Sequence, residues 1–325
     1  MKEVVAGVDI GGTNTVFGLV DKSGNVLAQG ELITTDYPDI KDFVTDLVSS
    51  IRKLVGGNSE MKLAGIGVGA PNANYHKGTI ELAPNLAWKG IVPLAALIKE
   101  QIDTPVIVTN DAKAAAMGEM IFGGAKEMKD FIVLTLGTGL GSGIVINGQV
   151  VYGHTGFAGE LGHSTIVPGG RICGCGRHGC YETYASASGL ARTALFMLSE
   201  KKDPSPLRDI APSRLTSRKV AEAALSNDKI ALEAIDYTAE KIAHGIINAI
   251  TFSSPEAVFL FGGLAQAGDL ILEPVRKYVE MGVMPIFRGT CKILLSGIPL
   301  SNAAILGSAA LVWNELIDRS VKRME

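Results

Sequence analysis

The sequence predicts an α/β protein built from two similar lobes, and three observations lead to this prediction. Segments typical of buried strands alternate with helical segments along all 325 residues, which is the pattern of an α/β layer architecture. A unit of strand, glycine turn and hairpin at the start of the chain occurs again about 125 residues later, a spacing too long for a solenoid repeat. Hydrophobic residues make up 47% of the chain, so material for two cores is ample. A chance likeness between two unrelated hairpins remains the alternative.

The first half of the chain contains the first copy of this unit. The predicted elements are strands 4–9, 15–20 and 26–31, helix 40–54, strand 63–69, helix 92–101 and strand 105–109. The turn composition of residues 21–25 predicts a hairpin. Phe43, Leu47 and Ile51 repeat at helical spacing and support the first helix. A further helix is expected to start near Ala112.

The second half repeats the unit and then adds helices. Residues 131–136 form an apolar run that leads into a glycine turn, and Asn147-Gly148 between apolar runs is a strong hairpin signal. The predicted elements are strands 131–136, 142–146 and 149–152, an insertion over 153–186, helices 187–201, 217–225 and 230–253, strand 258–262, helix 270–281, strand 292–296 and helix 303–319. The proline-containing segment 202–215 is expected to be an exposed loop.

Charge and the N-terminal sequence exclude several classes of protein. The chain has 30 basic and 33 acidic residues, so it offers no basic field for nucleic acid. No segment has the roughly 20 uninterrupted apolar residues that a membrane helix needs. The first apolar run is short and ends at Asp9, which does not suit a signal peptide. A chain without an export signal keeps its cysteines reduced, and a cytoplasmic location is therefore expected.

Two glycine turns follow strands at equivalent places in the repeat. They are Gly11-Gly12-Thr13-Asn14, preceded by Asp9, and Gly137-Thr138-Gly139. Backbone N–H groups that converge at such turns attract phosphate oxygens, and Asp9 could hold Mg²⁺ through water. Neither turn has the Gly-Lys-Ser/Thr of a Walker loop. Two matched turns could grip one nucleotide from both sides, whereas a single one would more often be only a turn.

Asn110 and Asp111 stand at the end of an apolar strand and before a predicted helix. Sites in α/β proteins gather at the carboxyl ends of strands, so Asp111 could orient a hydroxyl group and accept its proton. Helix capping by either residue is an equally good explanation from position alone.

Three of the four cysteines lie within eight residues and point to a metal. His163, Cys173, Cys175 and Cys180 make a closed Cys₃His set, which is a structural zinc arrangement with no open position for water. The spacing differs from that of common zinc fingers, so a clip for a loop is expected. His178 is an alternative ligand to His163, and three free buried thiols are the alternative to a metal site.

Two acidic residues accompany this cluster. Glu160 stands one helical turn before His163, and Glu182 follows Cys180 by two residues. Carboxylates beside a loop that a metal holds in place could bind the hydroxyl groups of a polyol.

These motifs together resemble the ROK family. The resemblance rests on Asp9-Ile10-Gly11-Gly12-Thr13-Asn14, Asn110-Asp111, Gly137-Thr138-Gly139, Glu160-Leu161-Gly162-His163 and the run from Cys173 to Glu182. The family includes bacterial glucokinases, fructokinases, N-acetylhexosamine kinases and xylose-type repressors. The cysteine motif joined to Glu-x-Gly-His is highly specific, and the resemblance covers essentially the whole chain.

The resemblance implies an actin-like ATPase fold of two ribonuclease-H-like lobes, with a cleft between them for the sugar and a zinc-clipped loop. We expect a small lobe over 1–112, a large lobe over 113–302 with the zinc-binding insertion, and a C-terminal helix over 303–325 that packs back on the small lobe. A homodimer is also expected from the family.

The resemblance further implies a role for each matched residue in an ATP-dependent sugar kinase. Asp111 is the base that takes the proton from the 6-hydroxyl of the sugar. The other implied roles are sugar binding by Asn85, Asn110, Glu160, His163 and Glu182, zinc binding by His163, Cys173, Cys175 and Cys180, binding of ATP phosphates and Mg²⁺ by Asp9, Gly11, Gly12, Thr13, Asn14, Gly137, Thr138 and Gly139, and contact with adenosine by Gly262 and Gly263.

The sequence indicates the reaction more clearly than it indicates which sugar is the substrate. Asn85-Leu86-Ala87-Trp88 resembles the Asn-Leu-x-Trp of the glucokinase branch and favours glucose, although Pro71-Asn72 stands where glucokinases commonly have Pro-Gly. N-acetylglucosamine, N-acetylmannosamine, mannose and fructose are the alternatives. A repressor is disfavoured, because family repressors carry a helix-turn-helix before the first glycine turn and Asp9 leaves no room for one. A sugar sensor that has lost catalysis would show a missing Asp111 or a broken glycine turn.

Overall fold

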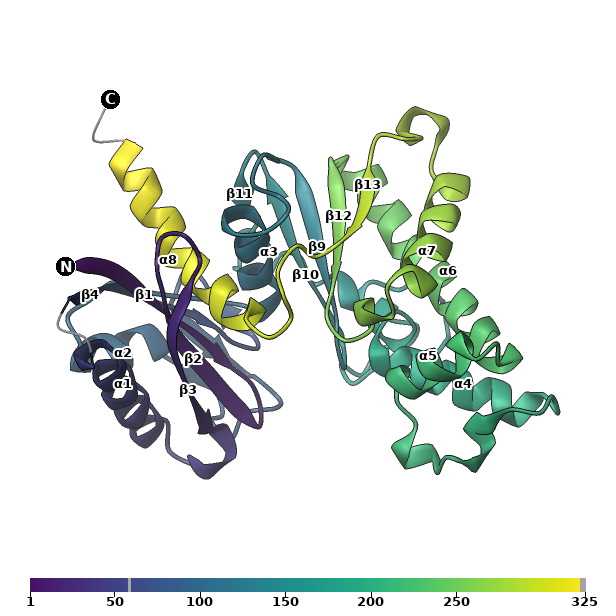
Figure 1. Ribbon diagram of the computed structural model, residues 1–325, viewed down its shortest axis with the longest axis horizontal. Helices are drawn as coiled ribbons and strands as arrows, with labels where there is room; N and C mark the ends of the chain where they lie inside the picture. The colour runs from purple at the N-terminus through teal and green to yellow at the C-terminus, as the bar shows by residue number, and fades with distance from the viewer. Residues whose placement is uncertain (58–59, 322–325) are drawn as a thin grey trace. The chain divides into compact units, whose positions relative to one another are not determined.

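The computed structural model describes residues 1–57 and 60–321, and residues 318–321 by their backbone alone. The chain forms two compact units (Figure 1). The first comprises Met1–Met128, Gly148–Ala158 and Gly297–Glu325, and the second comprises Lys129–Asn147 and Gly159–Ser296.

This division differs from the boundaries that we expected from the sequence. The expected boundary after residue 112 falls inside helix α3 (Asp111–Ile121), which the first unit keeps whole. The segment Gly148–Ala158 also belongs to the first unit, because the buried Asn74 side chain donates to the carbonyl oxygen of Thr155 at 2.9 Å. A continuous helix and a buried hydrogen bond each keep the residues that they join in the same compact unit.

The sheet of the first unit has the order β3-β2-β1-β4-β8. Its strands are β1 (Lys2–Ile10), β2 (Asn14–Val20), β3 (Val26–Ile33), β4 (Met61–Gly69) and β8 (Val106–Thr109). The first three strands form an antiparallel meander, and β4 and β8 continue the sheet parallel to β1. Parallel strands leave their carboxyl ends at one edge, and this edge carries the candidate site.

Helices cover both faces of this sheet. Helices α1 (Ile40–Gly56) and α2 (Leu94–Gln101) cover the face to which Val4, Ala6 and Val8 point, because alternate residues of a strand share a face. Helix α8 (Ala303–Val321) packs against β1 and β4, as Figure 1 shows. A Cβ atom at Gly67 would lie 1.8 Å from the carbonyl oxygen of Ser308, so only glycine allows α8 to come this close.

A small antiparallel sheet in the first unit was not predicted. It consists of β5 (Ala73–Asn74), β6 (Thr79–Glu81) and β7 (Ile91–Val92). Strands of two or three residues carry no detectable period. The sheet begins just after Asn72, which has a φ of 51°. Asparagine tolerates this left-handed conformation better than most residues other than glycine, which explains how Asn72 can stand where the glucokinase branch commonly has glycine.

The second five-stranded sheet has the order β11-β10-β9-β12-β13, and all of its strands except β11 belong to the second unit. Its strands are β9 (Phe131–Leu136), β10 (Leu140–Ile146), β11 (Gln149–Val150), β12 (Ala257–Phe261) and β13 (Lys292–Leu295). Strand β9 pairs antiparallel with β10 and parallel with β12, as β1 pairs antiparallel with β2 and parallel with β4. The two sheets therefore share one topology, which explains the repeat in the sequence.

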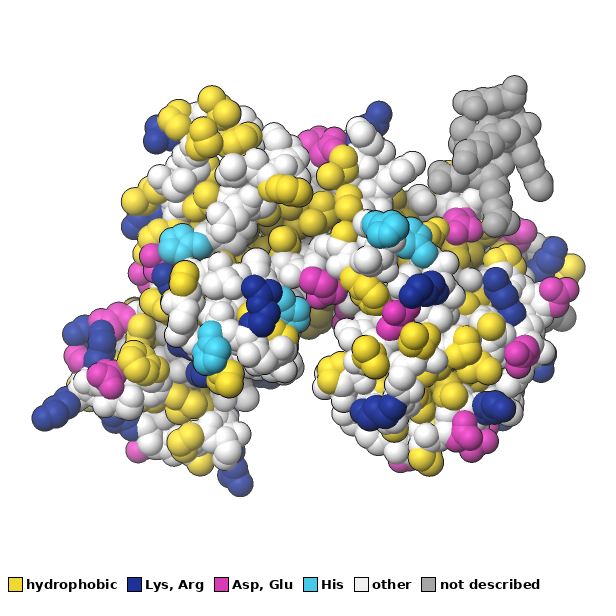
Figure 2. All heavy atoms as spheres, turned by 180° about the vertical axis from the view of Figure 1, so that it is seen from behind, with side chains coloured by type: hydrophobic (Ala, Val, Ile, Leu, Met, Phe, Trp, Pro, Cys, Tyr) yellow, Lys and Arg dark blue, Asp and Glu magenta, His cyan; other side chains and the backbone are white. Residues whose placement is uncertain are grey.

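Four α-helices belong to the second unit. They are α4 (Ala187–Glu200), α5 (Ser217–Leu225), α6 (Lys229–Ser253) and α7 (Asp269–Gly282). The buried Tyr181 hydroxyl donates to the carbonyl oxygen of Ile242 on α6 at 2.7 Å, and this bond anchors the loop that carries Cys180 and Glu182. No helix in the described part of the chain is long and apolar enough to cross a membrane. On the face seen in Figure 2, basic and acidic side chains are interspersed, in keeping with a formal charge of −3.

Candidate functional site

The carboxyl edge of the first sheet brings together residues from three strands. In the parallel register, Asp9 of β1 stands opposite Gly69 of β4, and Gly69 stands opposite Thr109 of β8. A Cβ atom at Gly69 would lie 3.3 Å from Oδ1 of Asp9. Asn110 and Asp111 follow β8 directly, so the topology places Asp9 near the start of α3.

Asn110 and Asp111 both accept a hydrogen bond at the N-terminus of α3. The Asn110 side chain is the N-cap and accepts from the backbone N–H of Ala112 at 2.9 Å. Oδ1 of Asp111 accepts from the same N–H at 2.8 Å. The capping explanation therefore holds for Asn110, while the second carboxylate oxygen of Asp111 is not needed for capping.

The pKa values of both aspartates are raised. Desolvation by the surrounding protein is the largest effect on Asp9, the negative charge of Asp111 adds to it, and together they raise the pKa of Asp9 to about 7. Desolvation also raises the pKa of Asp111, although the hydrogen bond from Ala112 and the charge of Lys113 act in the opposite direction. A carboxylate with a raised pKa is a better proton acceptor near neutral pH.

Lys113 is a functional candidate that the sequence did not reveal. Its side chain is only 1% exposed, and its Nζ lies 3.4 Å from the carbonyl oxygen of Gly156 in the segment Gly148–Ala158. Lysine is rarely buried to this extent without partners. The only sign of Lys113 in the sequence is its position two residues after Asp111 in an alanine-rich helix. Its burial depends on the tertiary fold and could not be predicted from that position.

The first glycine turn lies against Asn85. The N–H of Gly11 donates to the carbonyl oxygen of Asn14 at 2.9 Å and closes the turn. A Cβ atom at Gly12 would lie 2.8 Å from the backbone oxygen of Asn85 and 3.1 Å from its Cβ. Thr13 and Asn14 are exposed. The structure thus places a residue predicted to bind sugar beside residues predicted to bind phosphate.

The second glycine turn lies against Glu182. The carbonyl oxygen of Gly137 accepts from the N–H of Ala187, the first residue of α4, at 2.8 Å. A Cβ atom at Gly139 would lie 2.7 Å from Oε2 of Glu182, whereas a Cβ atom at Gly137 would meet nothing within 4 Å. The absence of a side chain at Gly139 therefore leaves room for the Glu182 carboxylate.

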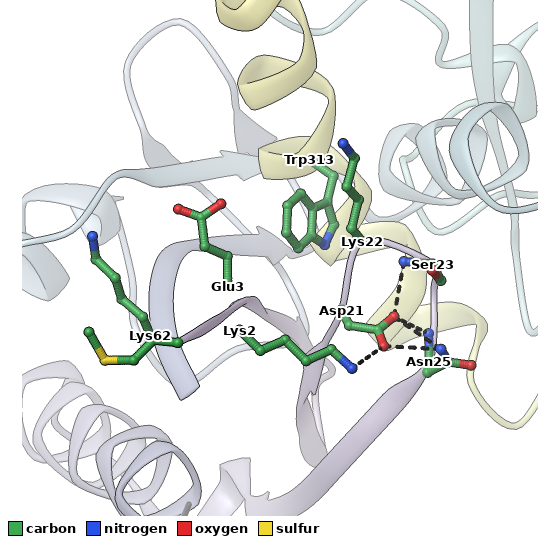
Figure 3. Close-up of a pocket in the computed structure, with 9 residues that line it drawn as sticks. Lys2, Glu3, Asp21, Lys22, Ser23, Asn25, Lys62 and Trp313 are labelled. Atoms are coloured by element: carbon green, nitrogen blue, oxygen red, sulfur yellow. Dashed lines mark hydrogen bonds and ion pairs between the residues drawn. The ribbon is translucent and has the colours of Figure 1, made fainter. Parts of the chain in front are cut away.

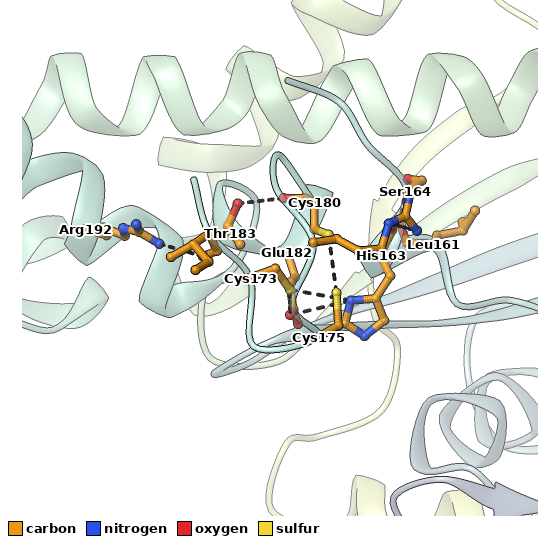
Figure 4. Close-up of polar contacts among 11 residues, drawn as sticks. Leu161, His163, Ser164, Cys173, Cys175, Cys180, Glu182, Thr183 and Arg192 are labelled. Atoms are coloured by element: carbon orange, nitrogen blue, oxygen red, sulfur yellow. Dashed lines mark hydrogen bonds and ion pairs between the residues drawn. The ribbon is translucent and has the colours of Figure 1, made fainter. Parts of the chain in front are cut away.

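The predicted metal ligands come together in the second unit. The ligand atoms of His163, Cys173, Cys175 and Cys180 all lie within 4.8 Å of one another (Figure 4). The Sγ atoms of Cys175 and Cys180 are 3.7 Å apart, as are Sγ of Cys173 and Nδ1 of His163. A tetrahedron with metal–sulfur bonds of about 2.3 Å has edges of about 3.8 Å, so this donor set fits zinc.

His178 does not belong to this group. Its Nδ1 lies 3.2 Å from the carbonyl oxygen of Gly170, and the metal-binding group of the described residues contains His163 instead. Burial raises the pKa of the Cys173 and Cys180 thiols, so metal binding must release their protons.

Glu182 connects the cysteine cluster to the glycine turn. Its Oε1 accepts from the Cys173 thiol at 2.9 Å and lies 3.7 Å from Nδ1 of His163, as Figure 4 shows. Since Nδ1 of His163 faces the cluster, Nε2 is the ring nitrogen left for a ligand. Glu160 precedes the short helix Leu161–His163 and is exposed.

Gly263 borders a cavity of about 550 Å³ in the second unit, and Gly262 precedes it in the chain. Gly262 has a φ of 101°, a conformation that favours glycine. The cavity also has an apolar side formed by Leu264 and Leu270 and a wall from α5. These further lining residues, Ser217, Arg218, Ala221, Glu222, Leu225, Leu264, Gln266, Ala267 and Leu270, were not predicted.

A family model described as the ROK family matches residues 5–315. The chain belongs to the ROK family. It is 35% identical over 311 residues to a glucokinase of Halalkalibacterium halodurans, with 94% of each chain covered. It is also 30% identical to a xylose repressor of Caldicellulosiruptor bescii, over 89% of this chain and 74% of the repressor.

A solved ROK structure is similar along almost the whole chain. The glucokinase from Streptomyces griseus, in complex with glucose and AMPPNP, is 32% identical, with a TM-score of 0.78 and coverage of 95% of this chain and 98% of that one. The actin-like ATPase fold predicted from the resemblance is confirmed. Since ROK relatives include both kinases and repressors, family membership alone does not assign an activity.

Proposed function

We propose that this ROK protein is an ATP-dependent hexose kinase that phosphorylates the 6-hydroxyl group of glucose. The observation that carries the proposal is Asp111, whose carboxylate stands at the carboxyl end of β8 with one oxygen left over from helix capping. The intact glycine turns and the similarity to a glucokinase solved with glucose and AMPPNP support it. Phosphoryl transfer requires mainly positioning and charge stabilisation from a protein.

In this proposal Asp111 accepts the proton of the 6-hydroxyl as that oxygen attacks the terminal phosphate of ATP. Desolvation raises the pKa of Asp111, which makes it a stronger base than an ordinary aspartate. The remaining hydroxyl groups of the sugar are held by Asn85, Asn110, Glu160, His163 and Glu182. Nε2 is the nitrogen through which His163 would do so, because Nδ1 faces the cysteine cluster.

ATP in this proposal is bound through its phosphates and its nucleoside. Gly11, Gly12, Thr13 and Asn14 and the turn Gly137-Thr138-Gly139 present backbone N–H groups to phosphate oxygens. The cavity beside Gly262 and Gly263 takes adenosine, since its volume and mixed lining are typical of small-molecule sites. Mg²⁺ would accompany ATP, and Asp9 would hold it through water.

Zinc in this proposal has a structural role. His163, Cys173, Cys175 and Cys180 would hold it, and it would fix the loop that carries Glu160 and Glu182. A closed set of four protein ligands leaves no position for a substrate.

Coupled ADP release with glucose, mannose, fructose, N-acetylglucosamine and N-acetylmannosamine tests the proposal. We expect glucose to lead in kcat/KM by at least about tenfold, which corresponds to about 1.4 kcal/mol in transition-state binding. Asp111→Asn is expected to abolish turnover while calorimetry still detects glucose binding. Turnover near the wild-type rate in Asp111→Asn would contradict the proposal that Asp111 is the base.

Two alternatives give different results in the same assay. An N-acetylglucosamine or N-acetylmannosamine kinase, or a fructokinase, would show its own sugar in the lead. A non-catalytic sugar-sensing regulator is favoured by the similarity to xylose repressors, and it would bind sugar without releasing ADP. A homodimer is proposed from the family, and light scattering of the purified protein measures it.

A further inference from the structure

A second cavity lies at the other end of the first sheet. Its volume is about 790 Å³, and it is lined by the first residues of β1, the turn between β2 and β3, the start of β4 and helix α8 (Figure 3). Strand β1 runs from Lys2 at this cavity to Asp9 at the candidate site, a distance of about 23 Å at the rise of a strand. The cavity is therefore not part of the candidate kinase site.

One of the two acidic residues that line this cavity, Asp21, is already neutralised. Asp21 forms an ion pair with Lys2 at 2.8 Å and accepts from the backbone N–H groups of Ser23 and Asn25. Although burial acts to raise it, the hydrogen bonds from Lys2 and Asn25 lower the pKa of Asp21 to about 2. Lys2 and Asp21 thus cancel one another and leave the charge of the cavity to its other residues.

Two further lysines line the cavity. Lys22 and Lys62 are exposed, and no ion pair within the described part of the chain engages either of them. Glu3 stands opposite Lys62 in the register of β1 and β4 and offsets part of its charge. Lys22 has no such neighbour among the lining residues, so the cavity retains an excess of positive charge.

A buried hydrogen-bond donor without an acceptor completes this cavity. Trp313 on α8 is only 4% exposed, and its Nε1–H has no partner among the described residues. An indole nitrogen can only donate, and an unpaired buried donor in a native protein calls for an explanation such as an unseen ion. Trp313 and Lys22 both line the cavity, and in the view of Figure 3 the ring nitrogen is turned toward the Lys22 side chain.

We propose that this cavity is a binding site for a small phosphomonoester, with the Trp313 N–H and the Lys22 ammonium as its principal donors and Lys62 as a third. Phosphate oxygens accept hydrogen bonds, and their negative charge complements the positive charge of the lysines. The cavity volume falls within the range of metabolite sites. The donor set contains no group that would read a sugar ring, so the phosphate is the recognised part.

Helix α8 links this cavity to the candidate kinase site. Oγ of Ser308 accepts from the N–H of Gly69 at 3.1 Å, at the carboxyl end of β4 where Gly69 adjoins Asp9. Ser308 and Trp313 are five residues apart on α8, which is about 7.5 Å along a helix. A ligand at Trp313 therefore contacts the helix that also packs at the carboxyl edge of the first sheet. The effect of this ligand on turnover rests on the proposed function, whereas its binding does not.

Nuclear magnetic resonance of the two tryptophan indole groups tests the binding. The chain has two tryptophans, and Nε1–H of Trp88 donates to Tyr37 at 2.9 Å, so Trp88 reports on the region of Asn85. Full-length protein labelled at the indole nitrogens is titrated with inorganic phosphate, with glucose 6-phosphate and with sodium chloride at matched ionic strength. Trp313→Phe assigns the two signals.

We expect a saturable shift of the Trp313 signal with both phosphate compounds and none with chloride. Lys22→Gln together with Lys62→Gln is expected to weaken binding by at least about tenfold, because hydrogen bonds to charged groups are individually strong. Lys41→Gln, an exposed lysine on α1 outside the cavity, should leave it unchanged. A Trp313 shift that follows ionic strength alone, or a double variant with wild-type affinity, overturns the proposal. If no sugar is turned over, the kinase proposal fails while this titration still decides the site.

Discussion

Replacing Gly139 by alanine tests whether Glu182 holds the sugar. The new Cβ atom would lie 2.7 Å from Oε2 of Glu182, which is about 0.7 Å closer than ordinary van der Waals contact, so the carboxylate must move away. Because the clash is with the far end of a flexible side chain, the fold should survive. The expected change is therefore in the site and not in stability.

The size of the effect follows from the contact that is lost. A hydrogen bond to a charged group contributes about 1.5–3 kcal/mol, which corresponds to a roughly tenfold to hundredfold rise in the sugar KM. The KM for ATP should change little, because the backbone N–H groups of the turn remain. Initial rates of coupled ADP release, measured over a matrix of sugar and ATP concentrations, separate the two constants.

Gly137→Ala is the matched control in the same turn. Nothing lies within 4 Å of a Cβ atom at this position, so the sugar KM should remain at the wild-type value. The reasoning is refuted if Gly139→Ala leaves the sugar KM within twofold of wild type, or if both variants change it equally. The second result would assign the effect to the turn and not to Glu182.

Three further perturbations follow from the site. Lys113→Met removes a charge that lowers the pKa of Asp111, so the acid limb of the pH profile of kcat/KM should move to higher pH. Lys113→Arg retains the charge and should leave the acid limb at the wild-type pH. An acid limb that does not move in Lys113→Met contradicts this role. Cys175→Ser should lose bound zinc, measured by a colorimetric chelator, together with sugar affinity, and a zinc-free variant that binds glucose normally would separate the two. The pKa of Asp9 is raised from 3.8 to about 7, so the folded protein keeps a proton that the unfolded chain releases, and the free energy of unfolding falls as pH rises through this window. Asp9→Asn should flatten that decline between pH 4.5 and 7.5 in urea titrations, and equal slopes in both proteins would contradict the assignment.

Most secondary structure was predictable because its signals are local. The apolar runs of β1, β9 and β12, the hairpin turn at Asn147-Gly148 and the helical spacing of α1 each lie within one short window. The small sheet β5-β6-β7 was missed because strands of two or three residues have no period. The grouping of Gly148–Ala158 with the first unit was not predictable, because the hydrogen bond from Asn74 to Thr155 joins residues 81 apart in the chain.

The sequence by itself determined the family motifs, the repeated unit and the three cysteines of the candidate metal site, because residue types at fixed spacing already restrict chemistry, whereas the choice of His163 over His178 came from the tertiary structure. Only the tertiary structure decided which of these residues touch. The approach of Glu182 to Gly139 joins segments distant in the chain. The burial of Lys113, and the Trp313 indole that has no acceptor among the described residues, depend on what packs around them. Such contacts are set by sheet register and helix packing, and these are properties of the whole fold that no local pattern encodes.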